Sequence, residues 1–262
     1  MDNRQKFSGK KTFFLYPQVI VYNEVITYLF IQEYEAYVVR DHPALRQLLK
    51  RFPDSIVFVN IDEKMTEKEW ETWIREVMND PVTAHVSIGI LTTGRDENIR
   101  RKYLTQVHIT SGFIHVSTDL KKLISQITEM LRVNAALGRR KFIRVTTNDE
   151  RMTTVNIPVD GRFITGNIMD ISAAGFSCTF QDDPFLEKNS LISDIQIKLK
   201  SVLLRSEAVV FGSRIEDMMK IYVFIFTPRT DSSTRAKIHA FIRTNVQKRM
   251  DIELKNNQVS LP

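Results

Sequence analysis

Two short groups of residues in the second half of the chain have types and spacing suited to binding a polar ligand. The first is an arginine pair four positions apart, Arg140 and Arg144. The second is Asp170, Ser172 and Gly175, at a turn between two expected strands. Arginine presents a planar fork of N–H donors that fits phosphate oxygens, and its flat face stacks on aromatic rings. With a carboxylate and a hydroxyl nearby, the set predicts ligand binding rather than catalysis.

The elements that must position these residues are six β-rich stretches after Gly138, separated by turn signals. They cover 153–159, 162–169, 175–180, 191–200, 202–211 and 218–227. Six antiparallel strands at this spacing predict a small barrel or sandwich. A closing helix is expected from about Ser233, with one apolar face, and a frayed polar tail is expected from Asp251.

Together these features resemble the PilZ family over residues 138–250. The family pattern is Arg-x-x-x-Arg on the loop entering a six-stranded β-barrel, Asp/Asn-x-Ser-x-x-Gly at the end of an early strand, and a helix after the last strand. The resemblance implies a domain that binds cyclic di-GMP. It assigns Arg140 and Arg144 to phosphate and guanine edges, and Asp170 to the guanine N1–H and amino group. Ser172 would add a hydroxyl hydrogen bond, and Gly175 a tight turn with close backbone approach.

Arg139 stands directly before the arginine pair and is the sixth candidate ligand residue. In proteins that this chain resembles, an arginine at that place stacks on a second ligand molecule, so the resemblance implies two ligands per chain. One departure concerns a late strand, where many family members carry a glycine and this chain reads Ser206-Glu207-Ala208-Val209-Val210. We expect the approach of the ligand from that side to differ.

The first half of the chain alternates five short apolar stretches with five helical patterns, which predicts a doubly wound parallel sheet. The expected strands are 12–16, 36–39, 55–61, 86–92 and 113–116, and the expected helices are 19–32, 43–52, 66–78, 96–107 and 120–136. This alternation is similar to that of response-regulator receiver domains. The expected division is therefore a receiver-like domain at 1–137, a PilZ-like domain at 138–250 and a tail at 251–262.

Most residues that a working receiver needs for phosphorylation are missing. Asn60 stands at the expected phospho-acceptor position, and the first strand runs into Tyr16-Pro17-Gln18 instead of an acidic pair. Only Thr92 matches the pattern. Asn60 cannot form an acyl phosphate, and Mg²⁺ would lack its carboxylate ligands. We therefore predict a non-phosphorylatable domain, and we interpret the nearby Asp62 as a solvated loop residue.

Charge and composition limit the classes of partner. The net charge is +6, and residues 138–262 carry 19 basic and 14 acidic side chains against 18 and 17 in residues 1–137. A basic domain favours phosphate-bearing partners, whether small nucleotide, nucleic acid or acidic lipid. The N-terminus is polar and the apolar runs are short, which predicts a cytoplasmic protein without a membrane span. The histidines show no metal-ligand spacing, so no metal and no cofactor other than the ligand are expected.

The sequence therefore predicts a cyclic di-GMP effector that is not an enzyme. It would transmit ligand binding to an unidentified protein partner through a change in interdomain arrangement, in motility or related bacterial surface behaviour. The alternative is a nucleic-acid-binding regulator that uses basic clusters at Arg100-Arg101-Lys102 and Lys248-Arg249. That alternative lacks a recognition helix and an aromatic stacking strip, so nucleic acid is not the expected partner.

Overall fold

The computed structural model describes residues 9–138, 141–147 and 152–259, with side chains described to residue 256. The chain divides into two compact units, Met1–Lys141 with Gln247–Pro262, and Phe142–Val246. The division thus falls after Lys141, a few residues later than the sequence suggested. We call the first the α/β unit and the second the barrel unit.

The α/β unit is built on a five-stranded parallel sheet in the order β2-β1-β3-β4-β5. This is the order of flavodoxin-like doubly wound sheets, and the predicted fold class of this half is confirmed. The strands are β1 (Thr12–Leu15), β2 (Ala36–Val39), β3 (Ile56–Asn60), β4 (Ser87–Thr92) and β5 (Phe113–His115).

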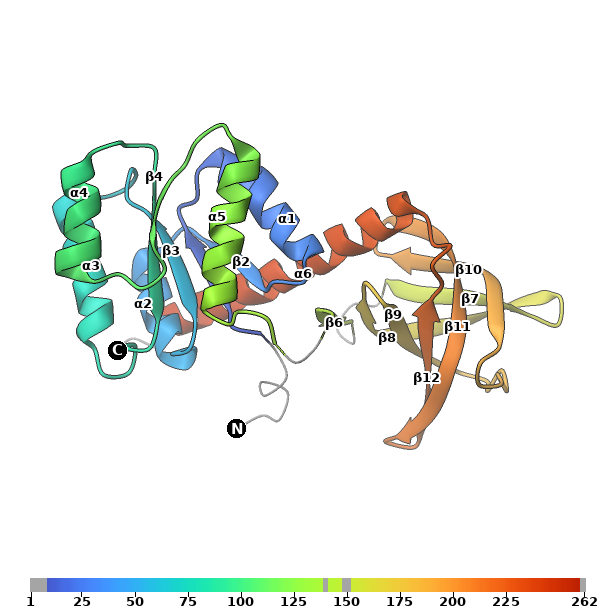
Figure 1. Ribbon diagram of the computed structural model, residues 1–262. Coiled ribbons are helices and arrows are strands. Elements are labelled where there is room, and N and C mark those ends of the chain that lie inside the picture. The colour runs from blue at the N-terminus through green and yellow to red at the C-terminus, as the bar shows by residue number, and fades with distance from the viewer. Residues whose placement is uncertain (1–8, 139–140, 148–151, 260–262) are drawn as a thin grey trace. The chain divides into compact units, whose positions relative to one another are not determined.

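Helices cover both faces of this sheet: α1 and α5 lie on one side, and α2, α3 and α4 on the other (Figure 1). They are η2 (Val21–Val25) with α1 (Ile26–Ile31), α2 (His42–Arg51), α3 (Glu67–Asn79), α4 (Glu97–Lys102) with η3 (Tyr103–Val107), and α5 (Leu120–Val133). The predicted caps are present, because Asp41 accepts from the backbone N–H of Ala44 at 2.8 Å and Thr66 forms a capping box with Glu69. Each cap satisfies N–H groups that the helix itself leaves unpaired.

The barrel unit is a closed six-stranded antiparallel barrel, as predicted. Its strands are β7 (Thr153–Val159), β8 (Arg162–Ser172), β9 (Gly175–Phe180), β10 (Leu191–Leu199), β11 (Val202–Glu216) and β12 (Met219–Phe226). They pair in the order β8-β7-β10-β11-β12-β9, and the β8–β9 pairing closes the ring. A seventh short strand, β6 (Arg144–Thr146), adds to β8. The sequence interpretation placed this segment in a loop, which is wrong for these three residues.

The two longest strands each contribute to two sheets. β8 pairs with β7 along 162–167, with β9 along 166–172 and with β6 along 170–172. β11 pairs with β10 along 202–209 and continues on β12 to Glu216. The ends of β8 and β11 therefore belong to one sheet, in the order β6-β8-β9-β12-β11, which we call the front sheet. Its inner face holds the stacked rings of Phe176 and Phe224, 4.8 Å apart.

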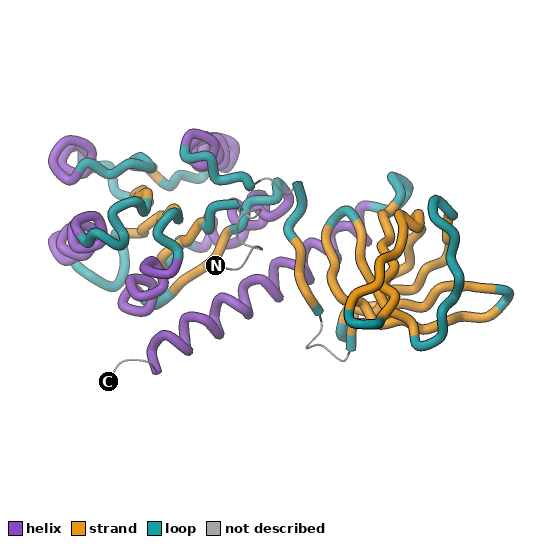
Figure 2. Tube along the Cα trace, turned by 90° about the horizontal axis from the view of Figure 1, so that it is seen from below, coloured by secondary structure: helices purple, strands orange, loops and turns teal. Residues whose placement is uncertain are grey.

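The last helix, α6 (Ser232–Val259), is unbroken in the described residues (Figure 2). The expected frayed tail from Asp251 is wrong as far as Val259. Met250 and Leu254 are both buried, and residues four apart share one face of a helix, so these turns have an apolar contact that favours the helix. At Gln247 the side-chain amide pairs with the backbone of Val38 on β2, donating to its carbonyl at 2.8 Å and accepting from its N–H at 2.9 Å.

Within the described ranges, no helix combines the length and apolar character that crossing a membrane requires. The same residues contain no group of three or more His, Cys, Asp or Glu side chains placed to hold a metal ion.

Candidate functional site

The pairing of β6 with β8 brings the second arginine of the motif to the aspartate. In this antiparallel register Arg144 lies opposite Ser172, and Thr146 lies opposite Asp170. Residues two apart on a strand project to the same face, so Arg144 and Asp170 share one side of the sheet. The Arg144 Nη1 atom lies 3.8 Å from Asp170 Oδ1. The arginine side chain is 57% exposed and the carboxylate 24%, so a cation and an acceptor face solvent together.

A buried hydroxyl fixes the other side of this carboxylate. Ser177 lies opposite Asp170 on β9, after a register irregularity between Ile168 and Asp170, and its Oγ donates to Asp170 Oδ2 at 2.6 Å. Ser177 is only 2% exposed. One carboxylate oxygen is therefore occupied by the protein while the other faces Arg144. The sequence interpretation did not include Ser177, because its contact depends on the β8–β9 register.

Ser172 is the last residue of β8 and lies opposite Gly175, next to the turn that leads into β9. Its Oγ donates to the carbonyl of Gly175 at 3.2 Å and accepts from the N–H of Ala174 at 3.3 Å. The residue is buried, and these contacts stabilise the turn that holds Asp170 on its strand. Its predicted hydrogen bond to a ligand stays a prediction.

Gly175 is required by the packing of one strand against the next. A Cβ atom at this position would lie 2.0 Å from the carbonyl oxygen of Phe224 on β12, well inside contact distance. The residue is not among those with positive φ, so close approach of backbone explains the glycine better than turn conformation does. The predicted approach of a ligand to Gly175 stays a prediction.

The remaining two candidates, Arg139 and Arg140, lie outside the described residues. The late strand that departs from the family pattern is described. Ser206 Oγ lies 3.0 Å from Thr230 Oγ1, and Glu207 accepts from the hydroxyl of Thr227 at 2.8 Å. These side chains connect β11 to the segment that leads into α6.

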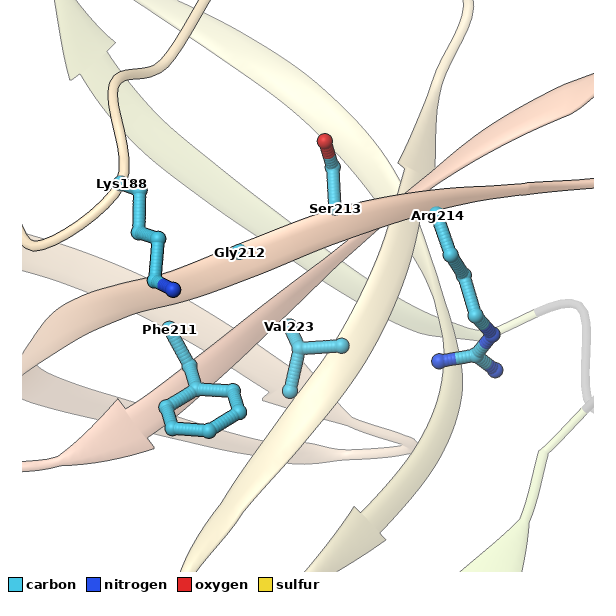
Figure 3. A pocket seen from close by; sticks show the side chains of 6 residues that line it. All are labelled: Lys188, Phe211, Gly212, Ser213, Arg214 and Val223. Carbon is cyan, nitrogen blue, oxygen red and sulfur yellow. The ribbon is translucent and has the colours of Figure 1, made fainter.

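A hollow of about 490 Å³ lies on the front sheet, over β11 and β12. Its lining residues are Lys188, Phe211, Gly212, Ser213, Arg214 and Val223. The Lys188 ammonium is directed toward Phe211, the Arg214 guanidinium lies on the far side of Val223, and Ser213 points away (Figure 3). The sequence interpretation did not identify this hollow.

The α/β unit has a closed hydrogen-bond network where a receiver binds Mg²⁺ and phosphate. Asn60 is fully buried, its Oδ1 accepts from Gln18 Nε2 at 2.8 Å, and its Nδ2 donates to the carbonyl of Tyr16 at 2.8 Å. Amides therefore fill the positions at which carboxylates would be needed.

Asp62 extends this network to β4. One carboxylate oxygen accepts from the Thr92 hydroxyl, and the other accepts from the N–H of Thr93 at 2.7 Å and from its hydroxyl at 2.8 Å. Burial raises the pKa of Asp62, but the hydrogen bonds from Thr92 and Thr93 together outweigh it and hold the pKa below its ordinary value. Asp62 is exposed, as expected for a loop residue, yet it also joins the β3 and β4 loops.

The first of the two basic clusters behind the nucleic-acid alternative, Arg100-Arg101-Lys102, is largely paired with acidic or polar side chains of its own unit. Lys102 Nζ lies 2.6 Å from Glu67 and 2.9 Å from Glu71, and Arg100 lies 3.2 Å from Glu97. These contacts reduce the positive potential that the cluster offers to a polyanion.

The single cysteine, Cys178, is buried in β9, and burial raises the pKa of its thiol well above the ordinary value. A thiol in this state is a weak nucleophile.

No protein-family model matches the sequence, and no curated protein matches it. Among solved structures, Escherichia coli YcgR in complex with c-di-GMP aligns with 47% of this chain and 51% of its own, at 12% identity and a TM-score of 0.38. The Bacillus subtilis inhibitor of motility, MotI/DgrA, aligns with 44% of this chain and 53% of its own, at 14% identity and a TM-score of 0.37.

A third solved structure is the Mn²⁺-bound response regulator Rcp1. It aligns with 48% of this chain and 94% of its own, at 15% identity and a TM-score of 0.38. This chain therefore spans about half the length of YcgR and of MotI/DgrA, and nearly the whole of Rcp1.

Proposed function

We propose that this protein is a cyclic di-GMP effector that binds the nucleotide on the front sheet of its barrel. The observation that carries the proposal is the placement of Arg144 beside Asp170, with the carboxylate held by Ser177. A guanine offers O6 and N7 acceptors and N1–H and amino donors, so an arginine and a carboxylate on one face complement its edge. The phosphates of the ligand add charge that arginine also binds.

The chain position of the motif supports a role in signal transmission. The arginine segment spans the division between the two units, since Arg140 precedes Lys141 and Arg144 follows Phe142. A ligand that orders this segment changes the linkage between the barrel unit and the α/β unit, and thereby the surface offered to a protein partner. In this proposal the α/β unit acts as a binding platform and is not itself phosphorylated.

Isothermal titration calorimetry with the full chain tests the binding proposal. Cyclic di-GMP is expected to bind, whereas cyclic di-AMP is not, because adenine lacks the N1–H and the 2-amino group from which Asp170 would accept hydrogen bonds. A parallel titration with duplex DNA tests the alternative function, that of a nucleic-acid-binding regulator. Absence of heat with cyclic di-GMP, or equal binding of both dinucleotides, would overturn the assignment.

Asp170→Asn is the isosteric substitution that tests base recognition by Asp170. The amide keeps the size of the side chain but loses the charge and one acceptor, so affinity for cyclic di-GMP is expected to fall about tenfold or more. A variant that binds as well as the parent chain would contradict the role of Asp170.

A further inference from the structure

We propose that the hollow over β11 and β12 is a second part of the cyclic di-GMP surface, in which Phe211 stacks on a guanine and Lys188 and Arg214 lie beside phosphate. This inference rests on the proposed function, because it takes the ligand from there. It assigns binding roles to three residues outside both motifs.

The first support is the position of the hollow relative to Asp170. Across the front sheet, Asp170 lies opposite Ser177, Ser177 opposite Val223, and Val223 opposite Gly212. Directly opposed residues project to the same face. Val223 forms part of the hollow and lies two strands from Asp170, roughly 10 Å away at the usual strand spacing. The hollow therefore continues the face that carries the candidate site.

The second support is a strand irregularity that displaces an aromatic side chain. The β11–β12 register shifts between Val210 and Gly212, which leaves Phe211 as the extra residue. Such bulges re-aim a side chain and occur next to binding sites. The side chain of Phe211 is 58% exposed, although the residue lies in the interior of β11 and not at its end. An exposed ring on this face is available to stack on a base.

The third support is the charge around the ring. Lys188 reaches toward Phe211 from the loop before β10, and Arg214 lies at the other side of Val223 (Figure 3). Arg214 uses its Nε to bind Glu216 at 3.1 Å. Within the described part of the chain, its terminal amino groups make no hydrogen bond or ion pair, and these are the donors suited to phosphate.

These features together select the chemical class of the occupant. An apolar floor at Val223, an aromatic ring and two cations suit a flat heterocycle that carries negative charge. A cyclic dinucleotide has two bases and two phosphates, so one guanine at Asp170 leaves other groups of the bound ligand to occupy the hollow.

A tryptophan at position 211 tests the contact directly. The native tryptophans, Trp70 and Trp73, are buried in α3 of the α/β unit, so they provide a constant background. We expect cyclic di-GMP to quench the fluorescence of Phe211→Trp with the same midpoint as the calorimetric titration, because stacked guanine quenches indole emission. Phe163→Trp is the matched control. Phe163 is also exposed, at 48%, but it pairs with Pro158 on β7, which is not part of the front sheet.

Affinity measurements on the full chain supply the second readout. Phe211→Ala is expected to weaken cyclic di-GMP binding about tenfold, the size of one lost base–aromatic stack. Lys188→Glu and Arg214→Glu should each weaken binding, whereas Lys198→Glu, an exposed charge reversal on β10, should not.

The outcomes separate the two proposals. If the parent chain gives no calorimetric binding, the proposed function fails. If the parent binds, but Phe211→Ala and both charge reversals bind equally well and Phe211→Trp shows no more quenching than Phe163→Trp, the hollow is rejected and the function stands.

Discussion

Ser177 holds Asp170 from the neighbouring strand, through a hydrogen bond of 2.6 Å from its hydroxyl to Oδ2 of the carboxylate. The hydroxyl is buried and the carboxylate is partly exposed, so the contact limits the directions in which the free oxygen points. Preorganisation of this kind lowers the entropy lost when a ligand binds.

Ser177→Ala should therefore weaken cyclic di-GMP binding by about 1 kcal/mol, or roughly fivefold, through loss of one hydrogen bond that positions Asp170. The measurement is a double-mutant cycle with Asp170→Ala by calorimetry. If Ser177→Ala costs as much affinity in the Asp170→Ala background as in the parent chain, Ser177 does not act through Asp170.

Removal of both motif arginines should weaken cyclic di-GMP binding strongly. Each lost charge-assisted contact costs about 1.5–3 kcal/mol, so Arg140→Ala with Arg144→Ala should reduce affinity at least about a hundredfold if the contacts add. Arg162→Ala, an exposed arginine at the opposite end of β8, is the control. Circular dichroism must show the same fold in all variants, and retained affinity in the double variant would refute the site.

Gly175→Ala should unfold or strongly destabilise the barrel before it affects ligand contacts. The new Cβ would overlap the Phe224 carbonyl, and relief requires β9 and β12 to separate, at a cost of about 3 kcal/mol or more. Urea unfolding measures the change. Gly94→Ala is a milder comparison, because its nearest contact is a side-chain oxygen of Thr92 at 3.2 Å. An alanine variant as stable as the parent chain would show that the strands adjust readily.

The α/β unit should not accept a phosphoryl group. Incubation with acetyl phosphate and Mg²⁺ should leave the mass of the chain unchanged, because Asn60 cannot be acylated and both oxygens of Asp62 accept hydrogen bonds. Asn60→Asp alone should also remain unmodified, since Gln18 provides no carboxylate for the metal. Mass spectrometry that detects an adduct on Asp62 would contradict this prediction.

Asp62 should make stability depend on pH in the acid range. Its pKa is lower in the folded chain than its ordinary value of 3.8, so the ionised form stabilises the fold above that value, and the contribution is lost as the pH falls through the depressed pKa. Asp62→Asn should lower the free energy of unfolding at neutral pH by less than about 1 kcal/mol, because solvent screens this exposed carboxylate, and the difference from the parent should shrink below about pH 4. A difference that stays constant to about pH 3 would exclude ionisation as its cause.

The parts of this structure that the sequence predicts are those with local causes. The Asp41 cap and the Thr66–Glu69 capping box depend on residues three apart, and both are present as expected. The strand β6 is three residues long and exists only because β8 lies beside it, so no local pattern reveals it. The role of Ser177 depends on the shifted register between β8 and β9. The role of Gly175 depends on Phe224 of β12, which is distant in sequence. The last turns of α6 could have been predicted from Met250 and Leu254, two apolar residues four positions apart that are both buried. The polar residues between and after them obscured this helical pattern.

The amide of Gln247 has a consequence for self-association. β2 ends the parallel sheet, and an end strand with unpaired N–H and carbonyl groups is a template for a strand from another molecule. By occupying both groups of Val38, a single glutamine side chain imitates a neighbouring strand at that point. Gln247 thereby covers the backbone groups of the edge strand at Val38, which removes one place where a strand from another molecule could pair.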